Sequence, residues 1–121
     1  MRKLLSLLFV VLFGSMLISS CGDSKPKEYK ANLENGKVIY NKSCIACHMT
    51  GVAGAAALTD KARWDAIAGK DINVLHKQSI DGYQGEYGVM PARGTCTDCT
   101  DQDLFDAINY MMDQAGVARK Q

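Results

Sequence analysis

The chain has 121 residues and a formal net charge of +1, so it is long enough for one small domain and excludes a multidomain enzyme. It lacks the basic excess that is typical of nucleic-acid-binding proteins. After residue 20, only 16 of 101 residues are Leu, Ile, Val or Phe, which is below the usual globular share of roughly 20%. Such a chain buries too little apolar surface for an ordinary core, so we expect disulfides, a metal or a cofactor at its centre.

The first 20 residues are expected to be a secretory signal. Two basic residues precede an apolar run over residues 4–18, and small residues follow, as at a signal-peptide cleavage site. Without this segment, 12 Lys and Arg face 13 Asp and Glu, which leaves a net charge of −1. The sequence Ile18-Ser19-Ser20-Cys21 resembles the lipobox of bacterial lipoproteins, which implies that Cys21 is lipidated. The alternative is an ordinary signal peptide with Cys21 near its cleavage site.

Residues 21–31 are expected to form a tether, and the domain is expected to span residues 32–121. The tether segment is rich in Lys and has one large apolar side chain, Tyr29, a composition typical of linkers. Several acyl chains on Cys21 would give stable anchoring, at about 0.8 kcal/mol for each buried methylene group. The sequence therefore predicts a domain anchored by lipid on the periplasmic side of a bacterial membrane. Gly22 follows the cysteine, which by resemblance to lipoprotein sorting favours the outer membrane over the inner one.

The motif with the clearest chemistry is Cys44-Ile45-Ala46-Cys47-His48, because CxxCH is the signature of covalent c-type haem attachment. Two thiols three residues apart at the end of a helix can form thioethers with the two haem vinyl groups. The adjacent His48 is then held with an imidazole nitrogen directed at the iron. Export agrees with this interpretation, because c-type haem is attached outside the cytoplasm. The predicted cofactor is one covalent haem c.

Other interpretations of the cysteines stay open. Cys44 and Cys47 could join Cys96 and Cys99 in a four-thiolate zinc site, although the two pairs are far apart and an oxidising compartment disfavours free thiolates. A thioredoxin-like redox site would need a βαβ context, and no strand pattern precedes Cys44. The second pair, Cys96 and Cys99, has no following His, and in an exported protein it favours a local disulfide.

Four short helices are expected, and each begins at a residue whose side chain caps helices well. The expected spans are 33–43 after Asn32, Thr59 or Asp60 to Gly69, Asp71 to Gly82, and Thr100 to Gly116. The last helix has an apolar face formed by Leu104, Ile108, Met111 and Ala115. Residues 50–58 and 83–94 are rich in Gly and Ala or Gly and Pro and are expected to be loops. Since no alternating strand pattern of useful length occurs, the predicted fold class is all-α.

His48 leaves one axial position of a haem iron to be filled. The candidates are a Lys, no ligand, or one of Met49, His76, Met90, Met111 and Met112. Met49 adjoins His48 and cannot reach the opposite haem face. Met111 and Met112 are expected to pack within the last helix, and His76 is expected to be a solvated surface residue. Met90 is favoured, because it lies in a loop that can wrap the far side of the haem and that Pro91 stiffens.

Residues 36–48, GKVIYNKSCIACH, resemble the first helix of class I cytochromes c, and Tyr110 resembles the aromatic residue that packs where the two terminal helices of that family cross. The segments CHMTGVAGAAAL, Ala62-Arg63-Trp64 and MPARGTCTDCTDQDL are similar to the cytochrome c-five subgroup, in which the cysteine pair forms a disulfide. The subgroup commonly has two glycines where this chain has Gly94-Thr95. The resemblance implies the class I cytochrome c fold over about residues 33–115. It also places Trp64 near a haem edge or propionate, the alternative being a plain core aromatic.

Together these features predict an electron carrier rather than an enzyme, with a His/Met-ligated iron. The expected partners are redox proteins that dock transiently at a haem edge ringed by Gly51, Val52, Ala53 and the Met90 loop. A net charge near zero argues against strong electrostatic steering, and neither nucleic acid nor a small-molecule substrate is expected. One alternative is a haem peroxidase or oxidase-associated subunit, which needs an open or displaceable sixth ligand. Another is a haem-based sensor, for which 101 residues would leave no room for an output domain.

Overall fold

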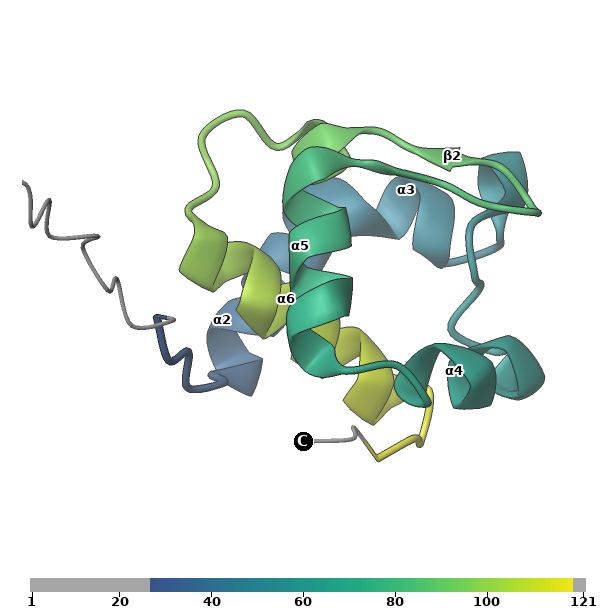
Figure 1. Ribbon diagram of the computed structural model, residues 1–121, viewed down its shortest axis with the longest axis horizontal. Coiled ribbons are helices and arrows are strands. Elements are labelled where there is room, and N and C mark those ends of the chain that lie inside the picture. Colours follow the sequence, from purple (N-terminus) through teal and green to yellow (C-terminus); the bar gives the residue numbers. More distant parts are fainter. Residues whose placement is uncertain (1–26, 119–121) are drawn as a thin grey trace, which may run out of the picture.

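Helices form most of the architecture of residues 27–118, the part of the chain that this computed structural model describes (Figure 1). The predicted signal segment, Cys21 and most of the predicted tether lie outside the described residues. Among the described helices, none has the length and apolar character needed to cross a bilayer. The order of elements agrees with the predicted all-α class, with one small hairpin added.

The first predicted helix is present and extends further than expected. Helix α2 (Leu33–Ile39) begins at Asn32, whose side chain accepts hydrogen bonds from two backbone N–H groups of the first turn. The helical path then continues through a π-helical segment (Tyr40–Cys44) and through α3 (Ile45–His48). The predicted end at residue 43 is therefore too early. A π turn changes which face of the helix the following side chains occupy, and such turns are frequent at functional sites.

The other three helices begin where the capping residues predict. Asp60 accepts a hydrogen bond at the start of α4 (Lys61–Ala68), and Asp71 does the same for α5 (Ile72–Asp81). Helix α6 (Asp101–Gln114) begins at Thr100, which forms a reciprocal pair of capping hydrogen bonds with Asp103. Each of these contacts satisfies backbone N–H groups that a helix start leaves without intrahelical partners.

The segment predicted as a loop over residues 83–94 contains regular structure. Strands β1 (Tyr83–Gln84) and β2 (Val89–Met90) form an antiparallel hairpin in which Tyr83 lies opposite Met90. A short 3₁₀ helix over Ala92–Thr95 follows. The expectation of a loop is therefore corrected. Strands of two residues are too short to produce an alternating pattern that the sequence could show.

The two terminal helices, α2 and α6, cross in direct backbone contact. A Cβ atom at Gly36 would lie only 2.3 Å from the backbone oxygen of Asp106 and 2.8 Å from the Cβ of Tyr110. The Tyr40 and Tyr110 rings pack beside this crossing with their centroids 5.5 Å apart. The predicted apolar face of α6 is buried, and the predicted packing role of Met111 and Met112 is confirmed by their burial.

His76 corrects another expectation, because it is only 5% exposed rather than solvated. Its Nε2 lies 2.7 Å from the backbone oxygen of Asp101, and its ring packs against Tyr29 and Phe105 with centroid distances of 4.5 and 5.3 Å. The chain preceding α2 covers this face of α5, which is why the side chain is buried. Packing against the domain therefore begins at Tyr29, within the segment predicted as tether.

Candidate haem-binding site

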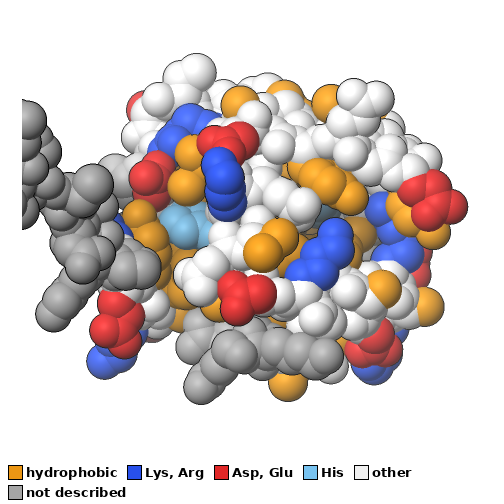
Figure 2. Space-filling view, in the orientation of Figure 1, with side chains coloured by type: hydrophobic (Ala, Val, Ile, Leu, Met, Phe, Trp, Pro, Cys, Tyr) orange, Lys and Arg blue, Asp and Glu red, His pale blue; other side chains and the backbone are white. Residues whose placement is uncertain are grey.

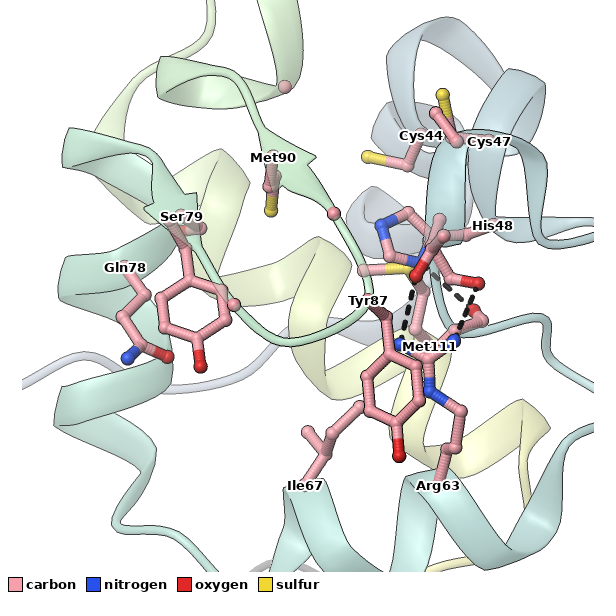
Figure 3. Close-up of a pocket in the computed structure, with 18 of the residues that line it drawn as sticks. Cys44, Cys47, His48, Arg63, Ile67, Gln78, Ser79, Tyr87, Met90 and Met111 are labelled. Carbon is pink, nitrogen blue, oxygen red and sulfur yellow. Dashed lines mark hydrogen bonds between the residues drawn. The ribbon is translucent and has the colours of Figure 1, made fainter.

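A cavity of about 660 Å³ opens between α3, α4, α5 and the hairpin (Figure 3). Its volume lies within the range of roughly 300–1,000 Å³ that is usual for ligand and cofactor sites. Apolar side chains from several elements line its walls, including Ile67, Leu75 and Ile108. The shortage of aliphatic residues in the sequence therefore corresponds to a central space with apolar walls.

Cys44 and Cys47 both line this cavity as free thiols. Cys44 is buried at the end of the π-helical segment, and Cys47 is exposed on α3. Burial, with a smaller contribution from the neighbouring Cys47 thiol, raises the pKa of the Cys44 thiol to about 11. Neither sulfur is committed to a disulfide, so both are available for thioether bonds.

His48, the last residue of α3, is oriented by a single backbone contact. Its Nδ1 lies 3.0 Å from the backbone oxygen of Ala56. Because a carbonyl oxygen can only accept, Nδ1 must carry the proton, which leaves the Nε2 lone pair free to bind a metal. Burial lowers the pKa of His48 and the Arg63 charge lowers it further, while the Ala56 contact raises it. The net lowering favours the neutral imidazole that metal ligation requires.

Met90 reaches the cavity from the opposite side, on β2. In Figure 3 its sulfur is directed into the space that also receives the Cys44 and His48 side chains. Among the other candidates for the sixth ligand, Met49, His76 and Met112 do not line the cavity, whereas Met111 and Lys70 do. The structure therefore brings together the four residues that the sequence assigns to the haem: Cys44, Cys47, His48 and Met90.

Trp64 and Arg63 line the same cavity from α4. The buried Trp64 donates a hydrogen bond from Nε1 to the Ala57 oxygen at 2.8 Å, and its ring centroid lies 6.2 Å from that of His48. Arg63 donates to two backbone oxygens of residues 54–55. The sequence contains no signal for this role of Arg63, because its partners are backbone atoms whose proximity only the fold determines.

Cys96 and Cys99 form a disulfide in the turn that precedes α6, with their Cα atoms 5.4 Å apart. Arg93, three residues after Met90, donates to the Cys99 oxygen at 2.6 Å and forms an ion pair with Asp101 at 2.9 Å. The disulfide removes two of the four thiolates that the zinc alternative requires.

The donor set and the shape of the cavity fit a covalently attached haem. Two free thiols are spaced for the two vinyl groups, and an imidazole nitrogen is available for the iron. A thioether sulfur lies across an apolar space of suitable volume. When bound, haem would supply a one-electron couple between ferric and ferrous iron, whose potential the residues that ligate the iron would tune.

Comparison with known proteins identifies the family. Residues 31–111 match the family model described as cytochrome c oxidase, cbb3-type, subunit III. Cytochrome c-555 of Chlorobaculum thiosulfatiphilum is 42% identical over 80 residues, which are 66% of this chain and 93% of that protein. Cytochrome c5 of Azotobacter vinelandii is 40% identical over 81 residues, which are 64% of this chain and 90% of that protein.

Solved structures agree with these relatives. A cytochrome c crystallised in an electron-transfer complex with nitrite reductase is 32% identical, with a TM-score of 0.61, and the match covers 71% of this chain and 99% of that one. A mono-haem ferrocytochrome c from Shewanella putrefaciens is 41% identical, with a TM-score of 0.54 and coverage of 67% and 95%. The predicted fold and cofactor are confirmed: the chain belongs to the class I c-type cytochromes, the electron-transfer proteins that carry covalently bound haem c.

Proposed function

We propose that this cytochrome is a lipid-anchored periplasmic electron carrier in which His48 and Met90 bind the haem iron. The observation that carries the ligation is the position of Met90 across the cavity from His48 (Figure 3). Cys44 and Cys47 would hold the porphyrin covalently on the His48 side. A His/Met pair raises the reduction potential and leaves no open iron position for oxygen.

The residues around the cavity support this role by limiting rearrangement. The Ala56 oxygen fixes the His48 ring, and the pairing of β1 with β2 fixes the backbone at Met90. Apolar walls exclude water from the haem, which disfavours the additional charge of the ferric state. A carrier with both axial positions filled exchanges electrons without exchanging ligands.

We also propose that redox partners dock at the mouth of the cavity. Val52, Tyr87 and Val89 line the cavity and are exposed, so they provide apolar contact area beside the haem. Figure 2 shows basic and acidic side chains interspersed over the visible face, without a large area of one sign. This distribution supports transient docking through a small apolar patch, and a relative captured in complex with nitrite reductase is a precedent for protein partners.

The carrier proposal is tested by carbon monoxide binding to the ferrous protein. Wild-type protein should not bind carbon monoxide near neutral pH, because Met90 fills the sixth position. Met90→Ala should bind it, and Met90→His should stay closed with a lower reduction potential. Met49→Ala is the matched control, since Met49 is exposed and does not line the cavity. Ready binding by the wild type would favour a peroxidase-like or sensing role instead.

A further inference from the structure

Arg63 on α4 contacts both segments that lead to the proposed iron ligands. Its guanidinium donates from Nη2 to the Gly54 oxygen at 2.9 Å and from Nη1 to the Ala55 oxygen at 3.1 Å. The same group lies over the Tyr87 ring, with its Cζ 4.1 Å from the ring centroid. Figure 3 shows the guanidinium beside the Tyr87 ring at one side of the cavity. One side chain therefore connects α4, the loop after α3 and the hairpin.

Each connected segment is short, and the hairpin carries Met90 while the loop contacts the His48 ring. Ala55 precedes Ala56, whose backbone oxygen holds Nδ1 of His48 at 3.0 Å. Tyr87 lies three residues before Met90, in the turn of the hairpin between β1 and β2. A displacement of either segment would therefore be transmitted to the imidazole or to the thioether.

The loop and the hairpin also meet directly, backbone against backbone. A Cβ atom at Gly54, where φ is +81°, would lie 1.8 Å from the Tyr87 oxygen. Tyr87 itself is 60% exposed, so burial contributes little to holding it in place. The cation over the aromatic face holds the Tyr87 ring, and the two charge-assisted hydrogen bonds hold the guanidinium against the loop.

We propose that Arg63 is a positioning residue that keeps the hairpin closed over the haem and so holds Met90 on the iron. This inference rests on the proposed His48 and Met90 ligation. Arg suits the role because its planar fork can donate to two carbonyl oxygens and stack on a ring at the same time, which an ammonium group cannot do.

The test compares the holoproteins of Arg63→Ala, Arg63→Lys and the wild type. The readouts are carbon monoxide binding by the ferrous form and the sulfur-to-iron charge-transfer absorption of the ferric form. Arg63→Ala should weaken that absorption and raise the carbon monoxide affinity by about tenfold or more, because the hairpin opens more often. Arg63→Lys should recover only part of the wild-type behaviour. Lys61→Ala is the matched control, since Lys61 also lies on α4 but pairs with Asp65 in solvent.

Tyr87→Leu provides a second route if Arg63→Ala does not mature. It removes the stacked ring and leaves the two carbonyl contacts, so it should open the site in the same direction by a smaller factor. A merely structural role would lower the denaturation midpoint without opening the iron under native conditions. If Arg63→Ala and Tyr87→Leu both stay closed while Met90→Ala opens, the inference about Arg63 is wrong and the ligation stands. If the wild type itself binds carbon monoxide, the proposed ligation fails and the inference fails with it.

Discussion

Asp106 is a fully buried carboxylate that joins the two ends of the domain. It accepts hydrogen bonds from the Asn32 backbone at 3.0 Å, from Asn35 Nδ2 at 2.9 Å and from Gln102 Nε2 at 2.8 Å. All three donors are uncharged, so the cost of burying the carboxylate is offset by hydrogen bonds rather than by an ion pair. These bonds fix the start of α2 against α6.

Asp106→Asn should lower the free energy of unfolding by about 1–3 kcal/mol. The substitution replaces one accepting oxygen by an NH2 group, so an N–H donor that faced this oxygen loses its acceptor. The haem spectrum should stay unchanged, since Asp106 does not line the cavity. Denaturant unfolding of the holoprotein measures the effect. Asp113→Asn, at an exposed position of the same helix, should be close to neutral. Equal midpoints for the two variants would contradict the assigned role of Asp106.

At this scale the sequence predicts residues whose role is set by near neighbours in the chain. The CxxCH motif and the caps at Asp60 and Thr100 are local patterns, and the structure has them where expected. His76 was not predictable in this way, because Tyr29 and Phe105 create its surroundings from distant parts of the chain. Arg63 is similar, since its partners are carbonyl oxygens that no side-chain pattern identifies.

At the scale of elements, the crossing of α2 over α6 depends on the absence of a side chain at Gly36. The facing atom is the backbone oxygen of Asp106, which cannot move aside as a flexible side chain would. Burial of apolar residues on the facing side of α6 then continues along the helix. The close approach of the two helices determines the position of the segment that carries Cys44.

Gly36→Ala should destabilise the holoprotein by about 1–3 kcal/mol, because the added methyl group forces the helices apart. This loss should exceed the gain in helix propensity of about 1 kcal/mol that Ala has over Gly. Thermal unfolding followed by circular dichroism gives the measurement. Lys37→Ala at the adjacent exposed position serves as the control. An unchanged or higher melting temperature for Gly36→Ala would show that the crossing is not tight.

Two elements could not be predicted from the sequence, for different reasons. The hairpin β1–β2 has strands of two residues, which is less than one full alternation of faces. The π-helical segment over Tyr40–Cys44 has the composition of an ordinary helix, and only its hydrogen bonds distinguish it. Both elements carry residues of the cavity, so the shape of the site was less predictable than its chemistry.

At the scale of the whole molecule, the scarcity of aliphatic residues predicted disulfides, a metal or a cofactor at the centre, and the fold has a cavity at that place. The composition could not indicate which side chains line the cavity, because they come from nearly every element. The position of Met90 across it from His48 follows the prediction from the sequence, which placed Met90 in a loop stiffened by Pro91.

The proposed anchoring at Cys21 is tested by fractionation. Cys21→Ser should release the cytochrome from membranes into the soluble periplasmic fraction with an unchanged spectrum, because several acyl chains are lost while the domain is untouched. Ser20→Ala keeps a small residue before the cysteine and should remain bound. Wild-type protein found mainly in the soluble fraction would contradict the lipid anchor.

Because Tyr29 packs against His76 and Phe105, the linker between the domain and the proposed lipid anchor would end at Tyr29. Between a lipidated Cys21 and Tyr29, residues 21–28 could span at most about 28 Å. That reach is comparable to the diameter of a domain of this size, whose radius of gyration is about 13 Å. The haem would therefore stay close to the bilayer surface. This confinement would raise its effective concentration for partners that are held at the same surface.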